Sequence, residues 1–335
     1  MKLPGWLSVA LKESPVVLGS RLVVELFDEW RQLTFQLGAA RCTRTRDKWQ
    51  AKLTVEFHAI EKGLSLGAPR LGFGEKRILE LISDLRTYRD RFDDPEFLAH
   101  PLATIRGYLA YNADRGFDPV KVREAFERLE SEQPRPTPTS TEGGVKLVRK
   151  SDLTSSGLDF EAFAMTRHSV RDFSSRQVTR EELLQAVATA QRAPSACNRQ
   201  AWHAHIFQAS AKDEILRFQG GSNGFVESVG AAVVVVGDLR SYFINEIHQP
   251  YVDGSLFAMT MMFAFHGQGM GSIPLTTSFK RRRLREFRRR FGIPEHQVPV
   301  MILGVGHLKD EFHVAISARR DVSESVTFHD GASKQ

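Results

Sequence analysis

Two arginines and a serine alternate along one short segment of this sequence. In TRHSVRDF (residues 166–173), Arg167, Ser169 and Arg171 are two positions apart. In an extended backbone such residues point to the same side. Guanidinium groups form bidentate, charge-assisted hydrogen bonds to phosphate oxygens, and a hydroxyl adds a further partner. The pattern therefore indicates phosphate binding, although two arginines near a helix start more commonly form a solvated surface.

A second stretch, RAPSACNRQAWHAHIF (residues 192–207), changes from small and polar residues to a strand-like end. It places Ser195, Asn198 and Gln200 within six positions. A plain turn needs only one or two residues of this kind. The stretch therefore indicates a loop that hydrogen-bonds a bound group.

Further motifs are few. A third stretch, SARRDVSESVTFH (residues 317–329), carries the pair Arg319 and Arg320. The sequence has no GxGxxG after a strand, no Walker A pattern, and no GxSxG or HExxH motif. The two cysteines, Cys42 and Cys197, are far apart and belong to no cluster with metal-ligand spacing. We therefore expect neither a disulfide framework nor a zinc site, and the cysteine usage favours a reducing, cytoplasmic compartment.

Helix and strand patterns are mixed after residue 153. Residues 179–193 predict a helix, with Thr179 and Glu182 spaced as in a capping box. AAVVVVGD (residues 231–238) is typical of a strand buried on both faces. We further expect strands at 203–207 and 298–307, a buried helix over 253–271 that ends at glycine, and an amphipathic helix over 280–291. The fold class predicted is α+β (α/β-like), with helices packed on a sheet.

The first part of the chain is predicted to be mostly α-helical. Apolar residues recur at helical spacing over residues 22–37, 76–92 and 119–130. A glycine-rich loop is expected over 57–76, where His58 and Glu61 could share a helix face. We favour a histidine satisfied at a buried helix end over a metal site for this pair.

Three regions follow from these patterns. Residues 1–130 form the helical N-terminal region, residues 131–152 a linker rich in Pro, Thr and Gly, and residues 153–335 the second domain. The composition, with 41% hydrophobic and 26% charged residues, is that of a water-soluble globular protein. No apolar run reaches 18 residues, so no membrane span is expected, and residues 1–20 are interpreted as mature protein rather than a signal peptide.

The basic charge is local. Residues 280–290 (KRRRLREFRRR) carry eight Lys or Arg and one Glu, while the whole chain has a net charge of +6, so the remainder is at −1. Such a run on a helix is usually a solvated face, although it could attract NADPH or an acidic substrate. We expect no nucleic-acid partner, and binding through residues 280–290 is kept as the alternative.

The order of these motifs resembles the FMN-dependent nitroreductase superfamily over residues 160–329. The matching segments are RHSVRDF, the acidic helix TREELLQAVATA, APSACNRQAW, the apolar helix leading into GQGMGSIPL, then GIP, ILGVGH and ARRDVSESVTFH. The resemblance implies a nitroreductase-type mixed sheet flanked by helices, and a homodimer with FMN at its interface. The N-terminal extension, with HAIEKGL at residues 58–64, resembles extensions of bacterial nitroreductase-like proteins associated with polysaccharide genes.

The resemblance also assigns cofactor contacts. Arg167 and Ser169 match phosphate and ribityl contacts, and Arg171 matches the basic residue near N1 and O2 of the flavin. The loop of Ser195 and Asn198 matches the segment that reaches FMN across the dimer interface. The full set implied is Arg167, His168, Ser169, Arg171, Pro194, Ser195, Ala196, Asn198, Gln200, Pro274, Leu275, Thr276, Arg319 and Arg320. The last two match a phosphate contact, and residues 274–276 match the backbone that passes N5 and O4.

Two departures from the family pattern bear on the substrate. Ala201 stands where the family usually has Pro, and TTSFKRRR follows SIPL where well-known members have Glu-Gly. The resemblance implies an oxidoreductase that takes hydride from NADH or NADPH and reduces a small organic acceptor in alternating, ping-pong fashion. Because the flavin carries the chemistry, no catalytic side chain and no metal is assigned. The alternatives are a substrate-specific flavin dehydrogenase or oxidase without nicotinamide, and a non-catalytic flavin-binding sensor.

Overall fold

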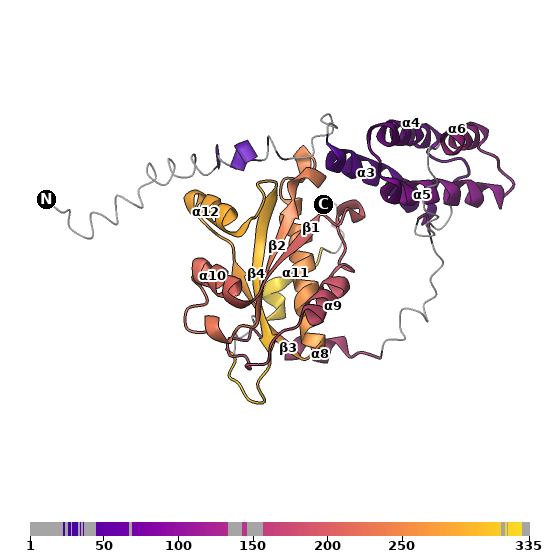
Figure 1. Ribbon diagram of the computed structural model, residues 1–335. Coiled ribbons are helices and arrows are strands. Elements are labelled where there is room, and N and C mark those ends of the chain that lie inside the picture. The colour runs from indigo at the N-terminus through magenta and orange to yellow at the C-terminus, as the bar shows by residue number, and fades with distance from the viewer. Residues whose placement is uncertain are drawn as a thin grey trace, which may run out of the picture.

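The structure contains a helical unit and a sheet-containing unit, as Figure 1 shows. It is a computed structural model, and it describes residues 23, 26–27, 29–32, 34, 36, 45–66, 69–132, 143–145, 157–315, 319 and 321–329. Among these residues, no helix is long and apolar enough to cross a membrane.

Four helices make up the N-terminal unit. They are α3 (Arg46–Leu64), α4 (Glu75–Arg91), α5 (Pro95–Ala113) and α6 (Val120–Ser131). Tyr88 and Tyr108 are fully buried in their shared core. Asp94 caps α5 by accepting a hydrogen bond from the backbone N–H of Phe97, and Pro95 occupies the first helical position, where its missing N–H costs nothing.

The glycine-rich loop predicted over residues 57–76 is shorter than expected. Helix α3 continues to Leu64, so His58 and Glu61 lie on the helix, with 3.0 Å between His58 Nδ1 and Glu61 Oε2. A Cβ at residue 63 would lie 2.3 Å from Cε2 of the Phe73 ring. Glycine at this helix position therefore lets the ring pack against the helix. A loop remains after the helix, and Gly72 in it has the positive φ angle that favours glycine.

A short piece of the predicted linker docks on the helical unit. The backbone N–H of Gly144 lies 3.3 Å from both Glu61 Oε1 and Thr104 Oγ1. A Cβ at Gly143 would come within 2.8 Å of the His100 carbonyl and the Ala103 side chain. Residues 143–145 are therefore held by contacts that need glycine. The remainder of the boundary at 131–152 stays a prediction, because most of it lies outside the described residues.

A four-stranded sheet forms the centre of the second unit, in the order β1-β2-β4-β3. The strands are β1 (Trp202–Phe207), β2 (Ala231–Asp238), β3 (Met270–Thr276) and β4 (Gln297–His307), and every named pair is antiparallel. A single parallel bridge joins Ser169 to Ser272 and adds a short extended segment beside β3. The predicted α+β class is confirmed.

Helices cover both faces of this sheet (Figure 1). α9 (Arg180–Ala190) and α11 (Gln249–Gly267) lie on one face, and α10 (Ala209–Gln219) and α12 (Arg281–Phe291) on the other. The valines of β2 alternate between the two layers, and all four are fully buried. The continuous β-branched run was therefore correctly predicted as a strand buried on both faces.

Shorter elements connect these layers. The capping box predicted at the start of α9 is present, since Thr179 and Glu182 bond each other's backbone N–H groups. A seven-residue helix, α8 (Phe160–Thr166), precedes the arginine segment. The 3-10 turns are η1 (Ala196–Asn198), η2 (Val226–Ser228), η3 (Leu239–Ser241), η4 (Ile244–Glu246) and η5 (Val322–Ser325).

Candidate functional site

The polar loop at residues 194–200 has an unusual backbone. Cys197, Asn198 and Gln200 have φ angles of 51°, 53° and 49°, in the left-handed region. Each such conformation in a residue other than glycine costs roughly 1 kcal/mol or more, and persists only where the surroundings impose it. Contacts with other parts of the protein must therefore hold the loop in this conformation.

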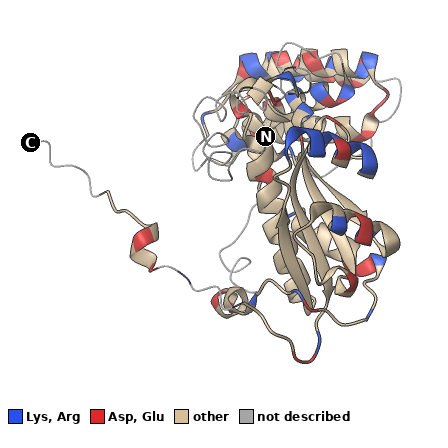
Figure 2. Ribbon diagram, turned by 90° about the vertical axis from the view of Figure 1, so that its left-hand side faces the viewer, with Lys and Arg blue, Asp and Glu red and all other residues tan. Residues whose placement is uncertain are grey.

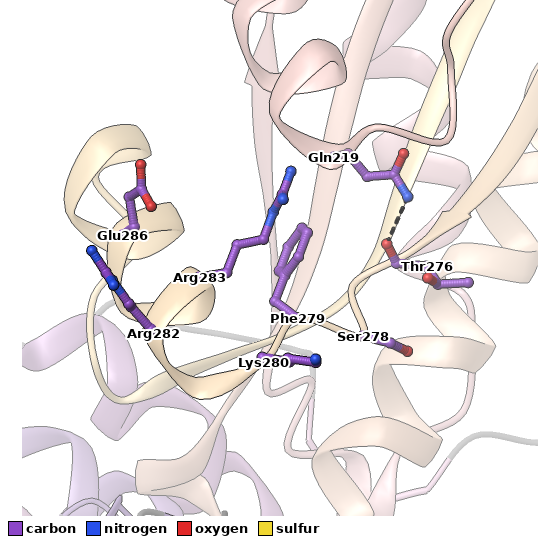
Figure 3. Close-up of a pocket in the computed structure, with 8 residues that line it drawn as sticks. All are labelled: Gln219, Thr276, Ser278, Phe279, Lys280, Arg282, Arg283 and Glu286. Carbon is purple, nitrogen blue, oxygen red and sulfur yellow. Dashed lines mark hydrogen bonds between the residues drawn. The ribbon is translucent and has the colours of Figure 1, made fainter. Parts of the chain in front are cut away.

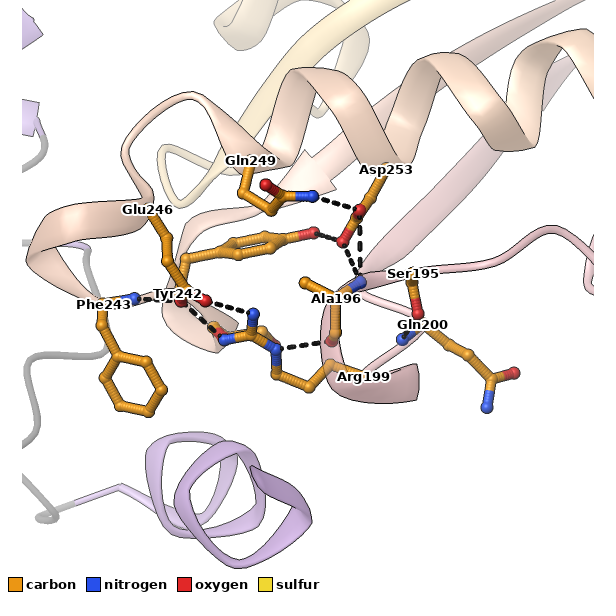
Figure 4. Close-up of polar contacts among 10 residues, drawn as sticks. Ser195, Ala196, Arg199, Gln200, Tyr242, Phe243, Glu246, Gln249 and Asp253 are labelled. Atoms are coloured by element: carbon orange, nitrogen blue, oxygen red, sulfur yellow. Dashed lines mark hydrogen bonds and ion pairs between the residues drawn. The ribbon is translucent and has the colours of Figure 1, made fainter. Parts of the chain in front are cut away.

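A buried carboxylate makes the first of these contacts. Asp253 on α11 is only 1% exposed, and its oxygens lie 3.2 and 3.3 Å from the backbone N–H of Ala196. Tyr242 Oη and Gln249 Nε2 also donate to it, at 2.9 and 2.8 Å (Figure 4). Burial, together with the neighbouring Asp253 charge, raises the pKa of Tyr242 far above its usual value, so its hydroxyl remains a donor.

A buried arginine makes the second of these contacts. The Arg199 guanidinium forms a bidentate pair with Glu246 at 2.7 and 2.8 Å, and its Nε donates to the Ala196 carbonyl at 2.9 Å. Its side chain is 1% exposed. Burial alone would raise the pKa of Glu246, but the hydrogen bonds from Arg199 hold it below its usual value. The ion pair is therefore maintained at neutral pH.

The helical unit reaches the same loop. Helix α3 packs against η1 and η3, and Figure 4 shows it beside Phe243. Asp47 on α3 accepts a hydrogen bond from Arg240 at 2.8 Å, and Arg240 also pairs with Asp238. The N-terminal unit thus packs against the loop at residues 194–200.

Within the loop, the predicted residues take different positions. Ser195 Oγ accepts a hydrogen bond from the backbone N–H of Gln200 at 2.9 Å, so it closes the loop on itself. Pro194, Asn198 and the Gln200 side chain are exposed. The exposed amide groups are therefore those that a ligand or another chain can reach.

The arginine segment is extended, as predicted. Ser169 forms the parallel bridge to Ser272, and the backbone N–H of Val170 donates to the Ser272 carbonyl at 3.1 Å. Val170 is buried against Gly271, so the alternate residues Arg167 and Ser169 point to the opposite side. His168 and Arg171 are exposed.

Arg167 has an unsatisfied nitrogen. Its Nη1 is buried and makes no hydrogen bond to any residue that the structure describes. A buried guanidinium nitrogen left without an acceptor costs free energy, so this donor is available to an added acceptor such as an anion. This fits the phosphate of the FMN that the sequence resemblance implies.

A histidine lies beside this arginine. Thr166 Oγ1 and His266 Nε2, near the end of α11, are 2.9 Å apart. Burial lowers the pKa of His266 below its usual value, and the charges of Arg167 and His168 lower it further. Neutral His266 is a compatible neighbour for the Arg167 cation.

The third predicted group lies at the end of β3. Pro274 is half-buried and Leu275 is buried toward the α12 layer. Thr276 is exposed, and its carbonyl accepts a hydrogen bond from Gln219 at 3.1 Å. Residues 274–276 and Tyr251 line a cavity of about 570 Å³, a size suited to a small organic molecule.

The structure brings only part of the predicted site together. Residues 167–171 and 274–276 both lie along β3, at one edge of the sheet. The loop at 194–200 leads into β1, at the opposite edge. Three strand spacings of about 4.8 Å separate these edges, roughly 14 Å. Arg319 is exposed, and Arg320 lies outside the described residues.

Sequence reasoning missed the residues that hold the loop. Asp253, Arg199, Tyr242 and Glu246 were not predicted as part of the site. One signal was available, because Asp253 is the single acidic residue in the otherwise apolar stretch 253–271. An acidic residue at such a position is expected to have buried hydrogen-bond partners.

Comparisons with known proteins identify the family of the C-terminal unit. Residues 164–223 match the nitroreductase family. A protein of Archaeoglobus fulgidus, provisionally named an NADH dehydrogenase/NAD(P)H nitroreductase, is 31% identical over 151 residues, which cover 44% of this chain and 83% of that protein. YodC of Bacillus subtilis, provisionally named an NAD(P)H nitroreductase, is 27% identical, over 42% of this chain and 85% of that protein.

A solved structure, an FMN-dependent nitroreductase from Clostridium difficile, has 20% identity and a TM-score of 0.43, over 50% of this chain and 98% of that one. The family match lies on the arginine segment and the strained loop, and the relatives extend it over most of their own length. Through its C-terminal unit, this chain belongs to the nitroreductase family and is a nitroreductase-like oxidoreductase.

Proposed function

We propose that the protein is an FMN-dependent oxidoreductase that takes reducing equivalents from NADH or NADPH and delivers them to a small organic acceptor. The observation that carries this proposal is the buried, unpaired Nη1 of Arg167 beside Ser169. Bound FMN would supply the hydride and electron transfer, and the protein would supply position and charge.

Each residue group has a distinct task in this proposal. Arg167 and Ser169 hold the phosphate end, where a charge-assisted bond satisfies the buried guanidinium nitrogen. Arg171 places a positive charge that stabilises an anionic reduced cofactor. Residues 274–276 form the wall along which the ring system lies, and reductant and acceptor would use the same face of it. Reductant and acceptor would therefore alternate, which predicts ping-pong kinetics.

A homodimer completes the site. Because the strained loop lies at the far edge of its own sheet, its exposed Asn198 is placed to serve a second copy. The outer face of α11 is apolar and exposed at Val252 and Leu256, and α8 adds Phe160 and Met165, the latter 72% exposed. Exposed apolar residues of this kind support a protein–protein interface.

The visible absorption spectrum of the purified protein tests the cofactor. We expect flavin bands that bleach when NADPH or NADH is added without oxygen. Bands that neither nucleotide bleaches would favour a substrate-driven dehydrogenase or a sensor. A colourless protein that does not take up added FMN would overturn the cofactor assignment.

Mixed dimers test the shared site. Arg167→Ala damages the phosphate-binding part of the proposed site, and Asn198→Gly damages the part contributed by the loop. Glycine preserves the positive φ at position 198. If the loop acts on the partner's cofactor, the heterodimer of the two variants has one intact site and regains about half of the wild-type activity. If the loop acts within its own chain, both sites stay damaged and no activity returns.

A further inference from the structure

A second cavity opens beside the proposed cofactor wall. It has a volume of about 640 Å³ and lies between the end of β3 and the start of α12 (Figure 3). Thr276, Ser278 and Phe279 line both this cavity and the one along residues 274–276. The two cavities therefore adjoin at these three residues, and the second is here named the α12 groove.

The α12 groove is positively charged. Lys280, Arg282 and Arg283 line it, against the single acidic residue Glu286. Figure 3 shows Arg283 and Lys280 beside Phe279, and Arg282 on the far side of Arg283, near Glu286. Arg283 is fixed in place, since it donates to the Phe218 carbonyl and its guanidinium lies 4.9 Å from the centre of the Phe218 ring.

Two of these cations are not used by the fold. Lys280 and Arg282 are exposed and have no hydrogen-bond or ion-pair partner among the described residues. Further along the same helix, Arg290 pairs with Glu214 and Arg288 donates to the Gln297 carbonyl, while Arg285 and Arg289 are exposed. What distinguishes Lys280 and Arg282 is that they line the groove beside Thr276, which Arg285 and Arg289 do not.

We infer that the α12 groove binds the 2′-phosphate of NADPH and makes the protein prefer NADPH to NADH. This rests on the proposed use of a nicotinamide reductant at residues 274–276. A phosphate dianion suits two flexible cations and one fixed guanidinium, and a groove of this size accommodates a nucleoside. NADH lacks this phosphate, so it would leave Lys280 and Arg282 without a partner.

The inference can be tested by binding alone, without turnover. Calorimetry would compare adenosine 2′,5′-bisphosphate, ADP and AMP with the full-length protein. We expect the bisphosphate to bind at least about tenfold more tightly than AMP or ADP, as charge-assisted hydrogen bonds imply. If ADP binds as tightly as the bisphosphate, the groove recognises the diphosphate common to both nucleotides, and the inference is overturned.

Two variants sharpen this test. K280Q/R282Q should abolish the preference for the 2′-phosphate and raise the KM for NADPH about tenfold, with little change in the KM for NADH. The matched control is R289Q, an exposed arginine of α12 that does not line the groove. Equal losses in both variants would show only general attraction to a basic helix. If neither nucleotide reduces a flavin, the proposed function fails, but the calorimetry still decides this inference.

Discussion

The arginine segment and the strained loop are both polar stretches of this family, yet they use their polar groups in opposite ways. In residues 167–171, Arg167 has a buried nitrogen without a partner, and Arg171 is exposed. In residues 194–200, Ser195, the Ala196 backbone and Arg199 all bond within the protein. The first stretch keeps binding capacity for a ligand, while the second uses it to hold a strained backbone.

This difference shows what residue type alone does not reveal. Ser195 and Ser169 are both candidate ligand contacts by type and by family position. Only the structure shows that the Ser195 hydroxyl accepts the Gln200 N–H and so shapes the loop, while its O–H can still donate to a ligand. Four predictions separate ligand binding in the first region from support of the backbone in the second.

The largest effect on ligand affinity is expected at Arg167. Arg167→Ala removes the charge-assisted bonds proposed for the phosphate, so the affinity for FMN should fall about 10- to 100-fold. The stability of the FMN-free protein should not fall, because the lost Nη1 had no partner among the described residues. Fluorescence titration of FMN gives the affinity. Arg176→Ala, which removes an exposed partner of Glu182, serves as the control and should leave the affinity unchanged.

The next effect is expected at Asp253, and it should be one of stability. Asp253→Asn replaces a buried acceptor of three donors with a group that is itself a donor on one side. We expect a loss of about 3 kcal/mol in the free energy of unfolding, measured with urea. The control Asp172→Asn removes a half-exposed partner of Lys309 and should cost less than about 1 kcal/mol. Similar losses in both variants would show that Asp253 does not hold the loop.

Most of the fold prediction came from patterns that are local in the sequence. The helices α4, α6, α9 and α12 and the strand β2 were predicted because periodicity, capping and β-branched runs are local in sequence. The helix α5 was missed, since Pro101 inside it and its nearly uniform apolar character hide the helical period. The tail of α3 was interpreted as a loop because the packing of Phe73 on Gly63 is a tertiary contact.

The candidate site was predictable in part for the same reason. Alternation along residues 167–171 is local, and the structure confirms the extended backbone, which also forms a parallel bridge that was not predicted. The contacts that hold the loop are not local in sequence. Asp253 lies about fifty residues from its partner Ala196, and Glu246 about as far from its partner Arg199. The separation of the two halves at opposite sheet edges follows from strand order, which no segment of the sequence encodes alone.

A smaller effect is expected where the helical unit meets the loop. Asp47→Ala removes the 2.8 Å contact with Arg240, but Arg240 keeps its pair with Asp238. Both partners are partly exposed, so the free energy of unfolding should change by less than about 1 kcal/mol. Hydrogen exchange of the backbone N–H groups at residues 196–199 should nevertheless increase, because α3 packs against η1. Lys121→Ala, which removes a surface pair inside the helical unit, should leave that exchange unchanged.

The smallest effect is a shift of one histidine, and it reports directly on the arginine segment. Burial and the charges of Arg167 and His168 lower the pKa of His266, so folding opposes its protonation. This residue therefore contributes stability that is present above its unfolded pKa of about 6.5 and is lost as pH falls toward the lower folded value. An anion bound at Arg167 would neutralise part of the opposing charge and raise the pKa of His266.

Binding of FMN or inorganic phosphate should then be coupled to proton uptake, and affinity should increase as pH falls through this range. NMR titration of the His266 ring, with and without phosphate, measures the shift. In Arg167→Ala the pKa should already be higher and should no longer respond to phosphate. A His266 pKa that responds equally in both proteins would mean that the anion binds elsewhere, and that the unpaired nitrogen of Arg167 is a feature of the fold rather than of the site.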